Sequence, residues 1–157
     1  TGKTTLLEKL IPLLREWGVR IAVLKHAHHD FDIDKPGKDS YRLRKSGAEQ
    51  MLVASDQRWA LMTETEQPTD FETLLNQFNH AELDLIIVEG FKGKSIPKIE
   101  LHRASLGHEL ICTTEDQCFI AVASDVPLEL PESISALDIN QPAQIADYIQ
   151  SSVLNNN

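Results

Sequence analysis

The chain begins with Thr1-Gly2-Lys3-Thr4-Thr5, and the apolar, helix-periodic stretch 6–14 follows directly. These five residues match the second half of the phosphate-binding pattern G-x-x-x-x-G-K-[ST]. In such a loop, backbone amides and a helix N-terminus surround phosphate oxygens, the lysine reaches the β- and γ-phosphates, and the next hydroxyl binds Mg²⁺. The stretch therefore predicts a nucleotide site at residues 1–5, with Lys3 as a phosphate-binding and catalytic group and Thr4 as a metal ligand.

Only half of this pattern is present, because the sequence contains neither the upstream glycine nor a strand that would feed the loop. A bare Gly-Lys-Thr also occurs by chance. Two features favour a true loop: a helix of the expected type follows, and a second motif of the nucleotide-binding type occurs at Glu89-Gly90. We therefore expect that the N-terminal strand and the first half of the loop are absent by truncation.

Composition narrows the class of protein. The chain has 157 residues and a formal net charge of −9, and one domain over residues 1–157 is expected. The acidic balance argues against nucleic-acid and anionic-membrane binding, which require clustered excess lysine and arginine. No apolar run approaches the roughly 18 to 20 residues of a membrane span. We expect a cytoplasmic protein whose partner is a metabolite or another protein, and we assign no chemical role to Cys112 and Cys118.

Apolar runs and amphipathic stretches alternate along the chain, as in an α/β sandwich. The run 83–88 is apolar on both faces, which is typical of a parallel-sheet strand covered by helices on each side. Gly18 and Gly47 favour the termination of two helices, and Pro12 predicts a kink in the first of them. The sequence therefore predicts a P-loop NTPase-like three-layer sandwich with a mostly parallel sheet. The expected helices are 3–17, 38–46, a segment from Pro68 through Phe78, and 142–153; the expected strands are 19–24, 50–54 and 59–63 as a hairpin or adjacent pair, 83–88, 99–101, 119–123 and 136–139.

The second nucleotide-type motif is Asp84-Leu85-Ile86-Ile87-Val88-Glu89-Gly90. In P-loop proteins a buried strand beside the loop ends in an acid that holds Mg²⁺, usually through water. Glu89 has that position, and Gly90 beside it would let the backbone approach a γ-phosphate. A solvated strand end followed by a turn glycine is the alternative. Together with Gly2-Lys3-Thr4, the motif predicts that Glu89 is a metal ligand and that Glu89 and Gly90 contact the nucleotide.

A histidine-rich segment, Lys25-His26-Ala27-His28-His29-Asp30, lies between these motifs. Three histidines and an aspartate within five positions suggest a metal site. Zinc sites, however, normally draw ligands from two separated segments, and a histidine-rich surface loop is often only solvated. Contact with phosphate or substrate is therefore favoured over metal binding.

The next segment, Lys35-Pro36-Gly37-Lys38-Asp39-Ser40, resembles a second phosphate loop only superficially. Asp32 stands where such a loop needs glycine, and an aspartate follows Lys38. Asp39 lies where nucleotide-sensing switch segments occur, and there it could polarise water or reach Mg²⁺ as a catalytic group. A helix N-cap explains the same residue, since aspartate caps helices routinely.

A cluster of basic residues coincides with this region of an otherwise acidic chain. Five of the fifteen lysines and arginines fall within the eleven residues 35–45, and they are Lys35, Lys38, Arg42, Arg44 and Lys45. The cluster predicts an anion site in which Arg44 and Lys45 contact a nucleotide. A pterin phosphate or an acidic partner protein would suit it equally, and a solvated helix face is the simpler alternative.

Asp125 follows the apolar run 119–123 and is the last candidate. An aspartate at a strand end can accept two hydrogen bonds from guanine N1 and N2, a pattern that adenine does not offer. This position therefore favours GTP over ATP. Turn chemistry before Pro127 explains the same aspartate about as well.

Several longer blocks carry a resemblance to a known family. The sequence resembles the molybdopterin-guanine dinucleotide biosynthesis adaptor protein B family over most of its length. The histidine-rich and Lys-Pro-Gly-Lys-Asp-Ser blocks are more specific than the loop fragment. The N-terminus departs from the family, which has a strand and a glycine-containing start of the loop there. The matching blocks are Gly2-Lys3-Thr4-Thr5, residues 25–30, residues 35–41, Leu43-Arg44-Lys45-Ser46-Gly47-Ala48 and residues 85–92.

This resemblance implies a P-loop protein that binds Mg²⁺ and GTP, hydrolyses GTP slowly and forms a homodimer. It also implies assistance to the guanylyltransferase that joins GMP to molybdopterin, and it makes molybdopterin itself a candidate ligand. Slow hydrolysis agrees with the sequence, in which no arginine finger or positioned glutamine can be assigned.

Two other classes of protein remain as alternatives. A P-loop kinase could hold a small anionic metabolite on the basic segment 35–45, although no helical insertion resembles the arginine-bearing lid of such kinases. The second alternative is an interaction scaffold whose phosphate-binding loop is vestigial.

Overall fold

The computed structural model describes residues 2–27, 31–112 and 118–155. The chain divides into two compact units, and each is described by itself. Unit 1 comprises Thr1–Leu24 and Asn79–Asn157, and unit 2 comprises Lys25–Phe78. The expectation of a single domain stays a prediction.

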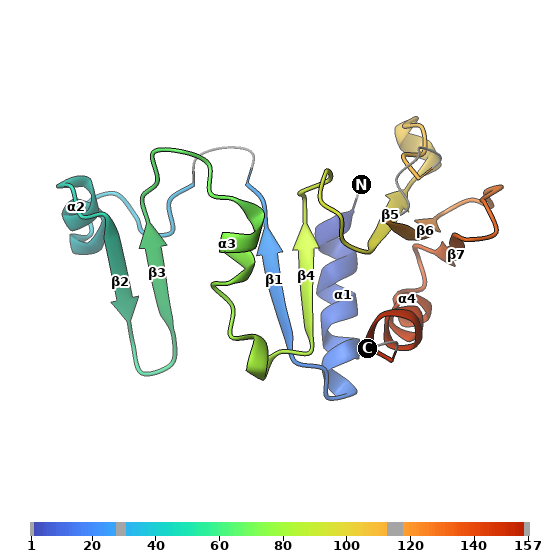
Figure 1. Ribbon diagram of the computed structural model, residues 1–157, viewed down its shortest axis with the longest axis horizontal. Helices are drawn as coiled ribbons and strands as arrows, with labels where there is room; N and C mark the ends of the chain where they lie inside the picture. The colour runs from blue at the N-terminus through green and yellow to red at the C-terminus, as the bar shows by residue number, and fades with distance from the viewer. Residues whose placement is uncertain (1, 28–30, 113–117, 156–157) are drawn as a thin grey trace. The chain divides into compact units, whose positions relative to one another are not determined.

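Unit 1 has an α/β architecture with parallel strands, as the sequence predicts. Strands β1 and β4 pair with each other and run in the same direction (Figure 1), and β5, β6 and β7 form a parallel sheet in that order. The register pairs Ile99 with Ala121 and Val122 with Ala136. The elements are α1 (Lys3–Glu16), β1 (Ile21–Lys25), the 3₁₀ turn η1 (His80–Glu82), β4 (Leu85–Glu89), β5 (Lys98–His102), the 3₁₀ turn η2 (Ala104–Leu106), β6 (Phe119–Ser124), β7 (Ser135–Asp138), α4 (Pro142–Ile149) and the π-helical turn η3 (Gln150–Leu154).

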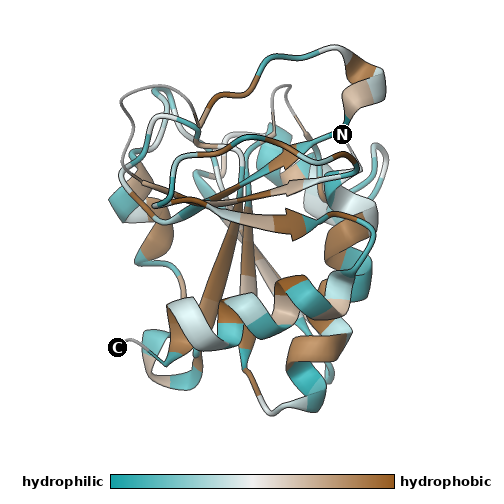
Figure 2. Cartoon of the chain, turned by 90° about the vertical axis from the view of Figure 1, so that its right-hand side faces the viewer, coloured by the Kyte–Doolittle hydropathy of each residue, from teal (hydrophilic) through white to brown (hydrophobic). Residues whose placement is uncertain are grey.

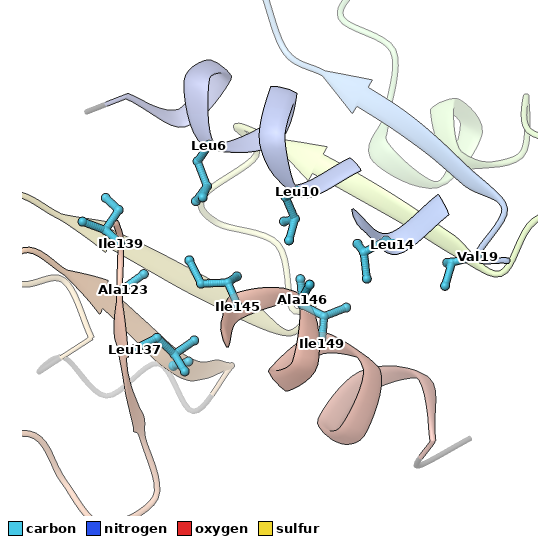
Figure 3. Close-up of a cluster of buried hydrophobic side chains, with 11 residues drawn as sticks. Leu6, Leu10, Leu14, Val19, Ala123, Leu137, Ile139, Ile145, Ala146 and Ile149 are labelled. Carbon is cyan, nitrogen blue, oxygen red and sulfur yellow. The ribbon is translucent and has the colours of Figure 1, made fainter. Parts of the chain in front are cut away.

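The core of unit 1 lies between α1, α4 and the three-stranded sheet β5-β6-β7. Leu6, Leu10 and Leu14 recur at every fourth position of α1 and are buried, since this spacing places them on one helix face. They point toward Ile145 and Ile149 of α4 (Figure 3), in a cluster that also includes Ala121, Ala123, Leu137, Ile139 and Ala146. Figure 2, coloured by hydropathy, shows strands that are largely hydrophobic and helices that carry both hydrophobic and hydrophilic residues. This apolar packing fixes the axis of α1.

The two ends of α1 follow the sequence rules for helix boundaries. Gly18 has φ 82° and donates a hydrogen bond from its amide to the Arg15 carbonyl at 2.9 Å, which ends the helix as predicted. Pro12 lies inside α1, which continues through it from Lys3 to Glu16. Gly2 is the N-cap of the helix and so stands directly before its first residue.

An ion pair joins the start of β1 to the start of β4. The Arg20 side chain donates to Asp84 Oδ2 from Nε at 3.0 Å and to Oδ1 from Nη2 at 2.8 Å, and the Arg20 amide donates to Oδ2 at 2.8 Å. The Asp84 amide donates back to the Arg20 carbonyl at 2.9 Å. Hydrogen bonds from Arg20 lower the pKa of Asp84 to about 2.

Unit 2 contains a short helix, an antiparallel hairpin and a second short helix. These elements are α2 (Asp39–Lys45), β2 (Gln50–Ala54), β3 (Trp59–Thr63) and α3 (Phe71–Leu75). Leu52 faces Leu61 in the hairpin, and the Ser55 amide donates to the Arg58 carbonyl at 2.8 Å across its turn. The predicted hairpin and both of its strand ranges are therefore confirmed.

The helix expected from Pro68 through Phe78 is shorter in the structure. Asp70 caps α3 by accepting a hydrogen bond from the Thr73 amide at 2.9 Å, so helical geometry starts at Phe71. After Leu75 the chain forms tight turns, in which the Phe78 amide donates to the Leu75 carbonyl at 3.2 Å. The apolar spacing predicted the buried face of this segment but not its end.

Within the part of the chain that the structure describes, no helix has both the length and the apolar character needed to cross a membrane.

Replacing Leu14 tests the core of unit 1. Leu14 has no exposed area, so Leu14→Ala leaves a cavity and should lower the free energy of unfolding by about 2–5 kcal/mol. Leu106→Ala is the matched control, because Leu106 is 42% exposed, and it should change stability by less than about 0.5 kcal/mol. Urea unfolding followed by circular dichroism measures both. Equal losses in the two variants would contradict the assigned core.

Asp84 should make stability depend on pH in acid. Its pKa is about 2 in the folded chain and about 3.9 in an unfolded chain. A lowered folded-state pKa contributes stability that is complete above about pH 4 and is lost as the pH falls toward 2. Asp84→Asn should therefore be less stable than the wild type at pH 7, and the difference should shrink as the pH falls through this window. Thermal unfolding across the pH range measures it, and a constant difference would refute the assignment.

Candidate functional site

The candidate site begins at the N-terminus of α1. Gly2 has φ 75° and ψ 18°, a left-handed conformation that glycine adopts without a steric penalty. Its carbonyl accepts the first helical hydrogen bond, from the Leu6 amide at 3.0 Å. The preceding amides of a helix have no partner within the helix, and the helix dipole makes this end electropositive. Lys3, Thr4 and Thr5 form this first turn and are exposed.

Glu89 approaches this turn from the end of β4. Lys3 Nζ lies 3.9 Å from Glu89 Oε1, and the side chains are 45% and 16% exposed, respectively. Gly90 and Phe91 have φ values of 98° and 52°, so the chain turns sharply directly after Glu89. Positive φ is uncommon for a phenylalanine and indicates a constrained turn. The mostly buried Glu89 carboxylate is therefore held beside the Lys3 ammonium group, and its role as a metal ligand stays a prediction.

Arg103 and Asp125 complete the site from the ends of β5 and β6. A Cβ atom at Gly2 would lie 3.6 Å from Arg103 Nε, which places the guanidinium group against the backbone at Gly2. Arg103 Nη1 lies 3.6 Å from Asp125 Oδ2. The other carboxylate oxygen, Oδ1, accepts a hydrogen bond from the Ala104 amide at 3.0 Å. Asp125 thus holds the segment that carries Arg103.

These groups share one edge of unit 1 because parallel strands end on the same side. Glu89, Arg103 and Asp125 lie at or directly after the carboxyl ends of β4, β5 and β6. Figure 1 shows the start of α1 at the end toward which β1 and β4 point. In open α/β sheets, ligands bind outside the carboxyl ends of the strands. The structure therefore brings together the predicted residues Gly2, Lys3, Thr4, Thr5, Glu89, Gly90 and Asp125, whereas Thr1 lies outside the described residues.

Sequence reasoning missed Arg103. The available signal was its place two residues after the expected strand 99–101, at the edge where Glu89 and Asp125 were expected. A strand end alone does not show which basic residue faces the loop. The contact with Gly2 depends on the path of the chain after β5.

The predicted anion contact Arg44 has a different environment in unit 2. Its side chain is 6% exposed, and Nη2 donates to Asp32 Oδ1 at 2.5 Å and to Asp34 Oδ1 at 2.8 Å. Nη1 donates to Glu64 Oε1 at 2.5 Å. The hydrogen bonds that Arg44 donates to Asp34, Glu64 and Asp32 raise the pKa of its guanidinium group, and the one it donates to Asp34 lowers the pKa of that carboxyl. Arg44 therefore joins α2 to the segment before it and to the end of β3, and its phosphate contact stays a prediction.

The other predicted residues of unit 2 lie on α2. Asp39 is the first residue of this helix, and Lys38 is the N-cap, so the alternative that Asp39 is the cap is not what the structure shows. A carboxylate in the first turn still stabilises the helix through its dipole. Lys45 is exposed and its Nζ lies 5.6 Å from the centre of the Tyr41 ring. Their roles as switch residue and nucleotide contact stay predictions.

The histidine-rich segment falls partly outside the structure. Residues 28–30 are not among the described residues, and His26 is. Among the residues that the structure does describe, no group of three or more histidine, cysteine, aspartate or glutamate side chains is arranged to hold a metal ion.

Comparison with known proteins identifies the family. Residues 1–125 match the family model described as MobB, molybdopterin guanine dinucleotide synthesis protein B. The chain belongs to this family. It is 54% identical over 151 residues to the molybdopterin-guanine dinucleotide biosynthesis adapter protein of Escherichia coli (strain K12), covering 95% of this chain and 85% of that protein. It is 47% identical to the adapter protein of Haemophilus influenzae, covering 96% of this chain and 83% of that one.

Solved structures of the MobB family share the fold. A crystal structure of molybdopterin-guanine biosynthesis protein B superposes with a TM-score of 0.70 at 25% identity, covering 96% of this chain and 92% of that chain. The MobB homologue from Bacillus stearothermophilus gives a TM-score of 0.70 at 24% identity, covering 99% and 92%. The predicted α/β fold with parallel strands and the predicted family are both confirmed.

Removing Arg44 should loosen unit 2. Without its guanidinium group, Asp32, Asp34 and Glu64 lose a shared donor and repel one another. Arg44→Met should therefore lower amide protection in residues 39–64 by at least about tenfold. Hydrogen exchange measured by mass spectrometry reports on this region separately from α1 and α4. Arg42→Met removes an exposed arginine from the same helix and should leave protection unchanged; equal effects of both changes would argue against the structural role.

Proposed function

We propose that this MobB family member is a Mg²⁺- and GTP-binding adaptor of molybdopterin guanine dinucleotide biosynthesis, with slow GTPase activity. The observation that carries the proposal is the convergence of Lys3, Glu89 and Gly2 at the start of α1, with Lys3 Nζ 3.9 Å from Glu89 Oε1. This arrangement combines an electropositive helix end, a phosphate-binding cation and a metal-binding carboxylate.

The phosphate chain of the nucleotide would lie on the first turn of α1. Backbone amides of this turn and the Lys3 ammonium group would bind the phosphate oxygens. In the proposed P-loop NTPase-like sandwich, residues 1–5 form the loop, and Gly90 would allow the chain after β4 to approach the terminal phosphate.

Thr4 and Glu89 fit a magnesium ion. Hydroxyl and carboxylate oxygens are the ligands that Mg²⁺ prefers, and it keeps several waters when two protein groups bind it. Glu89 is 16% exposed at the end of a strand, so few rotamers are open to it. The ion would neutralise charge on the phosphates. Asp125 is included as a residue of the same site, whereas the switch role of Asp39 and the nucleotide contacts of Arg44 and Lys45, all in unit 2, stay predictions from the sequence.

Family membership supports the cellular role. The relatives of Escherichia coli and Haemophilus influenzae are named adapter proteins of molybdopterin-guanine dinucleotide biosynthesis. An adaptor needs a partner protein, and we propose the guanylyltransferase that uses molybdopterin and GTP, with a cytoplasmic homodimer of this chain as the active form. Molybdopterin is a further candidate ligand.

GTP binding should depend on Lys3. Isothermal titration of the full chain with GTP should give clear binding in Mg²⁺ and weaker binding after the metal is chelated. Lys3→Ala should weaken binding by at least about tenfold, because a charge-assisted hydrogen bond to phosphate is lost. Lys9→Ala removes an exposed lysine from the same helix and should bind as the wild type does. If Lys3→Ala and Lys9→Ala bind GTP equally well, the loop is not the site.

Hydrolysis of GTP should be slow. The nucleotide-type motifs of the sequence contain no glutamine that could position water, and fast GTPases owe much of their rate to such a group and to an arginine that stabilises the transition state. We expect turnover well below about one per second. Release of phosphate from GTP by the purified chain measures this, and turnover many times per second would contradict the proposed slow hydrolysis.

A further inference from the structure

We propose that Arg103 binds the phosphate chain at the start of α1 and that Asp125 is the residue that positions it. This inference rests on the proposed function, because it assigns two groups to the same phosphate site. It adds a cation that the phosphate-loop motif does not contain and gives Asp125 a role other than base recognition.

The position of Arg103 carries the first step. Its Nε and Nη2 atoms would lie 3.6 and 3.9 Å from a Cβ at Gly2. The guanidinium group therefore lies against the residue whose left-handed conformation starts α1. A phosphate bound by the first-turn amides of the helix would lie close to this group. Arginine offers planar, paired N–H groups that match phosphate oxygens.

The contact with Asp125 carries the second step. Arg103 Nη1 and Asp125 Oδ2 are 3.6 Å apart, which is longer than a normal hydrogen bond, and the side chains are 34% and 22% exposed. A loose, partly solvated ion pair contributes little stability by itself. It does restrict where the guanidinium group lies. Asp125 is in turn fixed by the Ala104 amide, which donates to Oδ1 at 3.0 Å.

Two similar cation–carboxylate pairs lie at the carboxyl ends of the parallel strands of unit 1. Lys3 faces Glu89 at 3.9 Å, and Arg103 faces Asp125 at 3.6 Å. In both pairs the cation is the more exposed partner, and the carboxylate belongs to or directly follows a parallel strand. In a chain with a net charge of −9, two cations held at one helix N-terminus provide local attraction for a polyphosphate that the whole molecule would otherwise repel.

Positioning and base recognition by Asp125 lead to different results. If Asp125 reads guanine, its replacement should change the preference for GTP over ATP. If it positions Arg103, its replacement should weaken GTP, ATP and inorganic triphosphate by a similar factor. Its Oδ1 already accepts from Ala104 and its Oδ2 faces Arg103, which favours the second outcome.

The first experiment measures the affinity of the full chain for Mg²⁺-GTP and for inorganic triphosphate. Arg103→Ala and Arg103→Gln should each weaken both ligands by about tenfold or more, since a charge-assisted hydrogen bond is lost. Arg103→Lys should recover part of this loss, and the effect of Arg103→Ala should decrease in high salt. Arg15→Ala is the matched control, because Arg15 is exposed at the other end of α1, and it should bind as the wild type does.

The second experiment is a double-mutant cycle. Asp125→Asn keeps an oxygen that can accept from the Ala104 amide but removes the charge that faces Arg103. Alone it should weaken GTP, ATP and triphosphate by the same few-fold factor, and in the Arg103→Ala background it should have no further effect. Additive losses, or a loss confined to GTP, would overturn the positioning role. Thermal unfolding of each variant shows whether the fold is kept.

The outcomes separate this inference from the proposed function. If Lys3→Ala abolishes binding while Arg103→Ala and Arg103→Gln bind like Arg15→Ala, the phosphate site stands and the role of Arg103 is wrong. If Lys3→Ala has no effect, or if the wild type binds neither GTP nor triphosphate, both are wrong. If Arg103→Ala fails to fold, the affinities of Arg103→Gln and Arg103→Lys are compared instead. Weaker binding by Arg103→Gln than by Arg103→Lys supports the role of Arg103, and equal binding by the two variants contradicts it.

Discussion

The packing of α1 against α4 and the sheet of unit 1 is the constraint on which the candidate site depends. Leu6, Leu10 and Leu14 bury one face of α1 among residues of α4, β6 and β7. Because interiors are close-packed, this contact leaves the helix little freedom to slide or rotate. The N-terminus of α1 is thereby held beside Glu89 and Arg103. A phosphate site made of backbone amides needs such support, since amides bind well only when their directions are fixed.

At this edge of unit 1, the two cations are more exposed than the two carboxylates that they face. Glu89 is mostly buried at the end of β4, and Asp125 accepts a hydrogen bond from a backbone amide. Lys3 and Arg103 remain more exposed. A polyphosphate with Mg²⁺ needs both signs of charge, the cations for phosphate oxygens and the carboxylate for the metal. In the proposed site, the two ion pairs would therefore supply both signs of charge, with Lys3 3.9 Å from Glu89 and Arg103 3.6 Å from Asp125.

Local sequence signals predicted most elements, and long-range contacts decided the rest. The hairpin 50–54 and 59–63 was predictable from alternation and turn residues, whereas α3 was predicted too long because its apolar spacing continues past the turn at Leu75. Gly2, Lys3 and Glu89 belong to motifs with known spacing and could be found by inspection. Arg103 belongs to no motif, and only the folded path after β5 brings it to Gly2.

The two arginines of interest show why charge clusters in a sequence do not by themselves identify a binding site. Arg44 lies in the densest basic segment, yet its guanidinium group is buried and donates to three carboxylates. Arg103 is isolated in sequence but is one-third exposed and faces one carboxylate at 3.6 Å. An arginine whose donors are already taken by buried acids would have to break those hydrogen bonds before binding a phosphate. An arginine in a single loose pair loses little when it turns toward a ligand. Burial and the number of acidic partners therefore distinguish the structural arginine from the one available to an anion, and both quantities come from the fold.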